Sequence, residues 1–283
     1  MLSSIQSMVR SAYQNKYAVP HFNISNLEIA RYILEVCEEM RSPVVIAVTE
    51  TAVKYMGGYK VAANLVTSLI EDLDITVPVG LILDHGKTFE SCKKAIDVGF
   101  NGVMVGAPNL SIDENIELTN RVIAYARSKD VYVEGEIVAD VDNQQTEHSK
   151  AECINDAIKL VGETDIDALA PEIGSSHGIS DEAVEIDFES MEIISNNAHI
   201  PLVMHGGSGI PDHMIIKSIT NGVAKINIDS EFRVAWTANA RKFLNDNLKT
   251  YDLRQVNIAT KEAIKEVART KILLFGSNYK SLE

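Results

Sequence analysis

Eight short apolar runs, rich in β-branched residues, alternate along this chain with longer amphipathic stretches. Several runs are apolar throughout, which is typical of parallel strands covered on both faces. The stretches between them have the periodicity of helices, as over residues 26–40, 58–72, 89–98, 113–128, 154–161 and 188–196. The apolar runs are residues 18–22, 43–48, 77–83, 102–105, 131–134, 168–171, 201–204 and 223–226.

Eight strands separated by helices predict a closed parallel (β/α)8 barrel, the TIM barrel. Barrels of roughly 250 residues form one domain, so we expect residues 1–283 to form one. Residues 230–275 are expected to add further helices, ending at Gly276 and Ser277. The alternative is a doubly wound open sheet, but no Gly-x-Gly-x-x-Gly motif follows the first run.

The charge balance limits the partners. The chain has 40 acidic and 26 basic residues, a formal charge of −14, which disfavours binding to nucleic acid and to anionic membranes. No apolar run approaches the ~20 residues that span a bilayer. The first 17 residues have no signal-like apolar core. We therefore expect a cytoplasmic protein.

Three histidines follow predicted strands at the end of the barrel where such folds carry function. They are His85, His177 and His205, and a glycine follows each one. Glycine lets the backbone approach an ion without a Cβ clash. Any one of them alone would be read as a hydrogen-bonded polar residue, but three histidines with one open position match a catalytic zinc site.

Carboxylates accompany these histidines. Asp84 precedes His85, and an ionised carboxylate there could exchange a proton with a substrate, or it could orient a histidine. Glu134 and Glu136 share one face of a strand, either near the metal or as part of a salt-bridged barrel layer. His21, at the end of the first run, is a weaker candidate for a contact with substrate or metal ligand.

A phosphate site is predicted after the seventh and eighth runs. The glycine-rich turn 206–209 and residues 227–230 stand where barrels bind phosphate through backbone N–H groups and a helix N-terminus. Ser208, Asp229 and Ser230 could instead be simple helix caps. The negative charge of Asp229 opposes phosphate, so we expect it to fix the backbone or to bond a hydroxyl group.

The chain resembles the class II, zinc-dependent fructose/tagatose-bisphosphate aldolases over nearly its whole length. The matching segments are residues 19–28, 54–57, 83–86, 133–136, 173–178, 205–209, 225–229 and 251–254. The resemblance implies reversible cleavage of a ketose 1,6-bisphosphate to dihydroxyacetone phosphate and glyceraldehyde 3-phosphate, in carbohydrate metabolism such as glycolysis. It also implies Zn²⁺ or another divalent metal, with a monovalent cation as a further candidate, and a homodimer or homotetramer.

The same resemblance implies residue roles. His85, His177 and His205 resemble the zinc ligands, Glu136 a glutamate that reaches the metal in its alternate position, and Asp84 the residue that exchanges the proton on the C4 oxygen. Zinc chemistry needs no lysine Schiff base, so Lys225, which ends the eighth run, is discounted as a nucleophile. The residues similar to the family's substrate and phosphate contacts are Asn23, Thr49, Gly178, Gly206, Gly207, Ser208, Asn227, Asp229, Ser230 and, from a neighbouring subunit, Arg254.

Two departures from the family pattern leave the substrate open. Residues 106–109 lack the usual aspartate, and residues 137–142 lack a glycine pair whose loop supplies the carboxylate for the ketone-side proton. Asp140, Asp142 or Glu147 could replace that carboxylate. The alternatives are therefore an aldolase acting on another phosphorylated keto sugar or sugar acid, and a zinc-binding subunit without activity.

Overall fold

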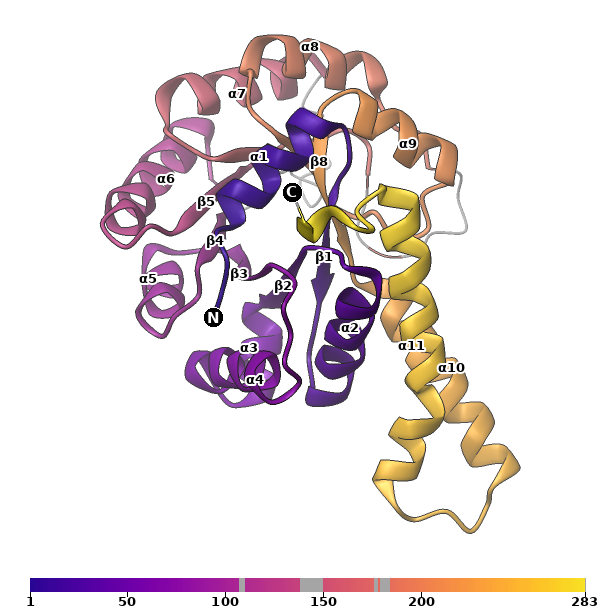
Figure 1. The fold of residues 1–283 in the computed structure, drawn as a ribbon. Helices are drawn as coiled ribbons and strands as arrows, with labels where there is room; N and C mark the ends of the chain where they lie inside the picture. Colours follow the sequence, from indigo (N-terminus) through magenta and orange to yellow (C-terminus); the bar gives the residue numbers. More distant parts are fainter. Residues whose placement is uncertain (107–109, 138–149, 176–177, 179–183, 283) are drawn as a thin grey trace.

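Eight parallel strands, paired in chain order, close into a barrel surrounded by helices (Figure 1). The computed structural model describes residues 1–106, 110–137, 150–175, 178 and 184–282. This confirms the predicted barrel and excludes the open sheet. The strands are β1 (Val19–Asn23), β2 (Val44–Thr49), β3 (Val79–Gly86), β4 (Gly102–Val105), β5 (Tyr132–Glu136), β6 (Ala168–Ala170), β7 (Leu202–Met204) and β8 (Val223–Ile228).

Each predicted helix is present, and several more occur. The predicted stretches correspond to α2 (Leu27–Met40), α4 (Tyr59–Asp72), α5 (Phe89–Asp97), α6 (Ile112–Arg127), α7 (Lys150–Glu163) and α8 (Phe188–Ala198). The additional helices are α1 (Ile5–Asn15), α3 (Glu50–Met56) and α9 (Asp212–Thr220). Among the described residues, no helix is both long enough and apolar enough to cross a membrane.

The helical region predicted after the barrel consists of two helices. α10 (Ser230–Asp246) and α11 (Leu253–Phe275) form a hairpin that projects from the barrel (Figure 1), here called the α10–α11 arm. Asp252 ends the connection by accepting a hydrogen bond from the backbone N–H of Arg254 at the start of α11. Gly276 ends α11 in a left-handed conformation, as predicted for a helix terminator.

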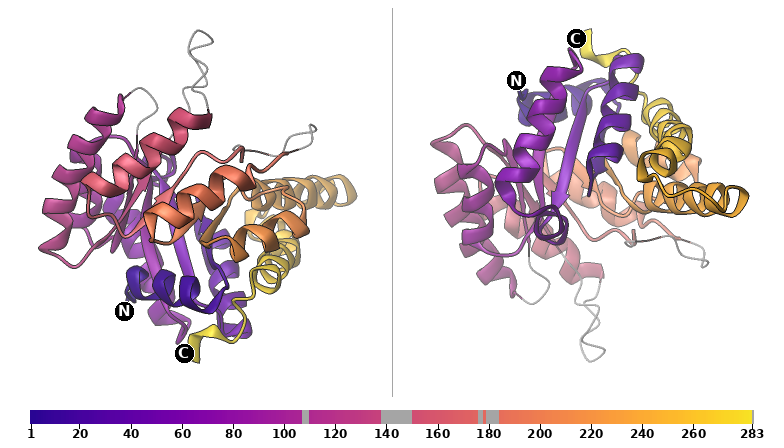
Figure 2. Two further views of the ribbon diagram at one scale, coloured as in Figure 1. Left: turned by 90° about the horizontal axis from the view of Figure 1, so that it is seen from above. Right: turned by 90° about the horizontal axis from the view of Figure 1, so that it is seen from below.

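Helix α1 closes the barrel end where both chain termini lie (Figure 2). Its Ile5 side chain is fully buried in an apolar layer inside the barrel. Glycines in two strands make room for it, because a Cβ atom on Gly80 or Gly102 would lie 2.3 or 2.6 Å from Ile5 atoms. The apolar layer fills this end of the barrel interior, and polar side chains occupy the opposite end.

Ion pairs attach α11 to α2 and predict a pH-dependent stability. The Glu35 carboxylate lies 2.9 Å from Lys265 Nζ and 3.0 Å from Lys261 Nζ. Burial opposes ionisation of Glu35, but these lysines and Arg31 lower its pKa from 4.5 to about 2. A carboxylate with a depressed pKa stabilises the fold fully above its unfolded value and loses that contribution as the pH falls toward 2.

Glu35→Gln is therefore expected to cost about 1–2 kcal/mol of unfolding free energy at pH 7, because the pair is only partly screened by solvent. The difference from the parent protein should shrink between pH 4.5 and 2. Denaturant titrations across this range measure it, with Glu71→Gln on the exposed side of α4 as the control. A difference that does not depend on pH would contradict the assignment.

Candidate active site

A residue near the end of β3 has a left-handed backbone conformation, and two neighbouring side chains line the same cavity as a result. His85 has φ 54°, a conformation that non-glycine residues rarely adopt, and the pairing of β3 with β4 shifts register between Leu83 and Gly86. Asp84 and His85 consequently both line a pocket of about 350 Å³ at the carboxyl end of the barrel.

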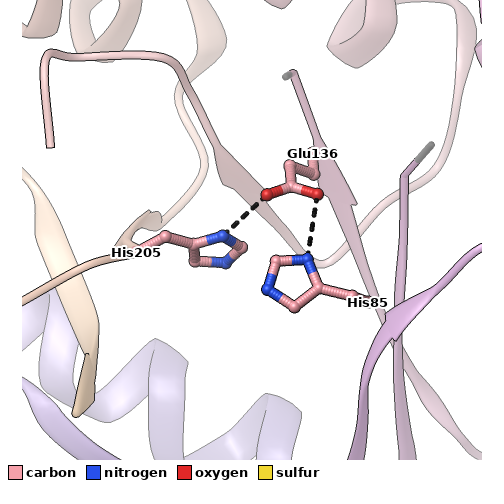
Figure 3. A group of neighbouring side chains, drawn as sticks. All are labelled: His85, Glu136 and His205. Atoms are coloured by element: carbon pink, nitrogen blue, oxygen red, sulfur yellow. Dashed lines mark hydrogen bonds and ion pairs between the residues drawn. The ribbon is translucent and has the colours of Figure 1, made fainter. Parts of the chain in front are cut away.

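His85, Glu136 and His205 converge beside this pocket (Figure 3). His205 Nδ1 lies 2.8 Å from Glu136 Oε1, and His85 Nδ1 lies 3.5 Å from Glu136 Oε2. The two imidazole rings meet edge to face with centroids 5.4 Å apart. One ligand atom from each of the three residues lies within 4.8 Å of the others, which is the arrangement a metal ion needs.

The charges of the buried carboxylates in and beside this cluster favour a positive charge there. Burial opposes the charge on each group, but mutual attraction lowers the pKa of Glu136 to about 2 and raises that of His205 to about 10. Burial likewise opposes ionisation of Asp84, yet His85 and His21 hold its pKa well below the usual range. Asp84 Oδ1 and Glu136 Oε2 are buried without a hydrogen-bond donor among the described residues, so each can accept from a ligand or face an ion.

Gly106 explains how Glu136 reaches this position. A Cβ atom on Gly106 would lie 2.8 Å from Glu136 Oε2 and 2.8 Å from its Cβ. The absence of a side chain at Gly106 therefore leaves the space that the Glu136 carboxylate occupies.

A buried charged layer lies beneath the cluster. Glu134 accepts a hydrogen bond from the Tyr132 hydroxyl group and contacts His205 Nε2 at 3.2 Å and Lys225 Nζ at 3.2 Å. The two roles considered for the glutamate pair are divided between its members. Glu136 faces the candidate metal site, and Glu134 belongs to a salt-bridged layer. Lys225 does not end β8 as expected: it is the third residue of that strand and is fully buried.

The predicted phosphate contacts largely gather on the same pocket. It is lined by Asn23, Thr49, Gly178, Gly206, Ser208, Asn227, Asp229 and Ser230, together with Asp84, His85 and Arg233. Gly207 instead packs against β8, where its N–H donates to the Asn227 carbonyl at 3.0 Å. Arg254 is an exposed residue of the α10–α11 arm, paired with Asp252, and does not line the pocket of its own chain.

The capping interpretation of these residues is mostly wrong. Ser208 does not begin a helix: its Oγ accepts a hydrogen bond from the Asp229 N–H at 3.3 Å. Asp229 precedes α10 but makes no capping bond with its side chain. Thr49, for which no capping role was predicted, does cap a helix, since its Oγ1 accepts a hydrogen bond from the Ala52 N–H at the start of α3.

Arg233 is a pocket residue that the sequence interpretation missed. Its Nε lies 2.9 Å from Asp229 Oδ1, one helical turn away on α10. The i, i+4 spacing of an aspartate and an arginine in a predicted helix could have indicated this pair. The guanidinium offsets the negative charge of Asp229, which otherwise opposes an anion in the pocket.

Some of the predicted residues fall outside the described part of the chain. His177 and the loop carboxylates Asp140, Asp142 and Glu147 lie there, as do residues 107–109. The third predicted histidine ligand therefore stays a prediction. Gly178, which follows it directly, lines the pocket.

Comparison with known proteins gives a consistent result. The family model for class II fructose-bisphosphate aldolase matches residues 3–280. The chain is 39% identical to a 6-phospho-5-dehydro-2-deoxy-D-gluconate aldolase of Halalkalibacterium halodurans, covering 100% of this chain and 99% of the relative. It is 41% identical to a fructose-bisphosphate aldolase of Geobacillus stearothermophilus, again covering 100% and 99%.

A solved structure agrees with both. The crystal structure of the YdjI aldolase from Escherichia coli K12 superposes with a TM-score of 0.84 at 29% identity, covering 99% of this chain and 100% of that one. The barrel, the histidine–carboxylate cluster at its carboxyl end and a family match over almost the entire sequence lead to one assignment: the chain belongs to the class II fructose-bisphosphate aldolases, a family of carbon–carbon lyases.

Proposed function

We propose that the protein is a zinc-dependent aldolase that reversibly cleaves a ketose 1,6-bisphosphate, of fructose or tagatose type, to dihydroxyacetone phosphate and glyceraldehyde 3-phosphate. The observation that carries the proposal is the convergence of His85, Glu136 and His205 beside a pocket that Asp84 also lines. His85 and His205 would hold the ion, with His177 as the third imidazole and Glu136 as an alternate ligand. When bound, Zn²⁺ supplies a Lewis acid that polarises the ketone oxygen.

Asp84 is assigned the proton of the C4 hydroxyl. Its carboxylate is buried, its pKa is held low by His85 and His21 against the effect of burial, and Asn23 Nδ2 donates to its Oδ2 at 2.8 Å. An ionised, oriented carboxylate can accept the hydroxyl proton as the C3–C4 bond breaks, and return it in the synthetic direction. For the ketone-side proton we propose Asp140, Asp142 or Glu147, which lie outside the described residues.

The ketone half of the substrate is assigned to the strand ends of β7 and β8. Asn227 would bind the dihydroxyacetone part, and its phosphate would lie against the residues after β6, β7 and β8. Arg233 makes this assignment electrostatically consistent because it offsets Asp229. The residues assigned to this half are Gly178, Gly206, Ser208, Asn227, Asp229 and Ser230.

The aldehyde half is assigned to Thr49 and to Arg254 of a second subunit. The Arg254 side chain is 86% exposed, and the same part of the α10–α11 arm exposes Leu248, Tyr251 and Leu253. Exposed apolar side chains grouped on a projecting hairpin are typical of a protein–protein contact. We therefore propose a homodimer or homotetramer in which the arm of one subunit completes the site of another.

A second substrate is favoured by one of the relatives. The Halalkalibacterium protein, which matches the whole chain, is named for a phosphorylated deoxy-keto sugar acid. Retro-aldol cleavage of such a compound releases the same dihydroxyacetone phosphate with an aldehyde acid as the other product. The altered segments at residues 106–109 and 137–142 support a changed substrate.

Cleavage assays of the purified, metal-loaded protein test the proposal and separate the two substrates. Fructose 1,6-bisphosphate, tagatose 1,6-bisphosphate and 6-phospho-5-dehydro-2-deoxy-D-gluconate are compared through the rate of dihydroxyacetone phosphate release. We expect one of the bisphosphates to be cleaved, a chelator to remove the activity, and Zn²⁺ to restore it. Cleavage of the sugar acid alone would support the second substrate. Metal binding without cleavage of any of the three would support a subunit without activity.

A further inference from the structure

Two buried side chains near Asp84, those of His21 and Lys225, take part in no step of the proposed chemistry. β1 and β8 pair so that His21 lies opposite Asn227, and His21 and Lys225 are both completely buried. His21 is thus at the centre of β1 rather than at its end. Burying an imidazole and an ammonium group is costly unless each is fully hydrogen-bonded, so their partners indicate what the pair does.

Three acceptors surround the Lys225 ammonium group. Its Nζ lies 2.8 Å from His21 Nδ1, 2.8 Å from Asn227 Oδ1 and 3.2 Å from Glu134 Oε2. An ammonium group has three protons and no acceptor, so it donates one proton to each partner. His21 Nδ1 must then accept. With Lys225 charged, the ring is neutral and its single proton is on Nε2.

That proton faces the proposed proton-transfer residue. His21 Nε2 lies 3.8 Å from Asp84 Oδ1, and neither atom has a hydrogen-bond partner among the residues described. Asn23 Nδ2 donates a hydrogen bond to the other oxygen, Oδ2, at 2.8 Å. His85 Nε2 is 3.9 Å from the same Oδ1. The carboxyl torsion of aspartate is broad, so one hydrogen bond from Asn23 does not by itself fix its plane.

We infer that His21 and Lys225 are positioning residues for Asp84: Lys225 sets the tautomer of His21, and the Nε2–H of His21 orients the Asp84 carboxylate for proton transfer. The inference rests on the proposed function of Asp84. It agrees with the electrostatics of the ring, because burial and the charge of Lys225 lower the pKa of His21 to about 4, which leaves it neutral at physiological pH.

Two substitutions of nearly equal shape test the inference. Glutamine at position 21 offers one acceptor and one donor, as the neutral ring does, whereas methionine offers neither. In the metal-loaded enzyme, His21→Met should lower kcat by about 10- to 100-fold, the usual cost of losing a group that orients a reacting residue. KM and metal content should stay unchanged, and His21→Gln should keep most of the activity.

Three results would overturn the inference: equal kcat losses in the two variants, a loss confined to KM, or a loss of metal from His21→Met. A double-mutant cycle adds a further test, since in an Asp84→Ala background His21→Met should cost little more. An additional loss of the full size would mean that His21 acts without Asp84.

A measurement on the unmutated, metal-loaded protein does not depend on turnover or on how the variants fold. Nitrogen-15 NMR of the histidine rings should show His21 neutral, with the proton on Nε2 and an unprotonated Nδ1. The opposite tautomer, or a doubly protonated ring at neutral pH, would contradict the role of Lys225. If the protein cleaves none of the substrates, the proposed function fails, but this spectrum still decides whether the Lys225–His21 arrangement exists.

Discussion

Replacing His205 by alanine is expected to abolish metal binding and carbon–carbon cleavage together. His205 lies within hydrogen-bond distance of both Glu136 and Glu134, so its ring is the central member of the histidine–carboxylate cluster. Alanine removes one of the proposed imidazole ligands. The buried carboxylates of Glu134 and Glu136 then lose the imidazole that lies between them. Because a Lewis acid contributes several kcal/mol of transition-state stabilisation, turnover should fall roughly a thousandfold or more.

Elemental analysis and cleavage rates on the same sample measure this effect. His213→Ala, at an exposed position at the start of α9, is the matched control and should keep both metal and activity. Thermal unfolding of both variants shows whether the barrel is intact. Stoichiometric metal together with zinc-dependent turnover in His205→Ala would reject the assignment of the cluster as the metal site.

The second large effect is expected for Asp84→Ala, which should leave the metal in place while turnover collapses. Asp84 is not one of the three residues whose ligand atoms converge, and its Oδ2 is held by Asn23 rather than by a histidine. Removing it therefore takes away the proposed proton carrier and spares the ion. General acid–base groups typically contribute about 10²- to 10⁴-fold, so a kcat loss of that size is expected.

Metal content, kcat and KM of Asp84→Ala are compared with those of Asp72→Ala, an exposed aspartate at the end of α4. The two predictions are complementary, since one variant loses the ion and the other keeps it. Near-normal turnover in Asp84→Ala would show that another group moves the C4 proton. Loss of metal from this variant would instead place Asp84 among the ligands.

Local sequence pattern was sufficient for the barrel strands and for most of the surrounding helices. Continuous apolar runs are a consequence of burying both faces of a parallel strand, so the eight runs and the eight strands coincide to within a few residues. Helix α1 was missed because the burial of Ile5 depends on Gly80 and Gly102, which are distant in sequence. The position of the break between α10 and α11 was not predicted, because residues 247–252 contain neither the glycine nor the proline that usually marks the end of a helix.

The sequence by itself determined the chemical types present at the carboxyl end of the barrel, because residues that follow parallel strands must meet at that end. His85, His205, Asp84 and most of the predicted phosphate contacts therefore lie around one pocket. Only the tertiary structure decided how they are paired. The Glu136 carboxylate reaches both histidines because Gly106 leaves it space, and Lys225 and His21 come together because β1 pairs with β8. Such pairings depend on distances between strands far apart in the chain, which no local pattern records.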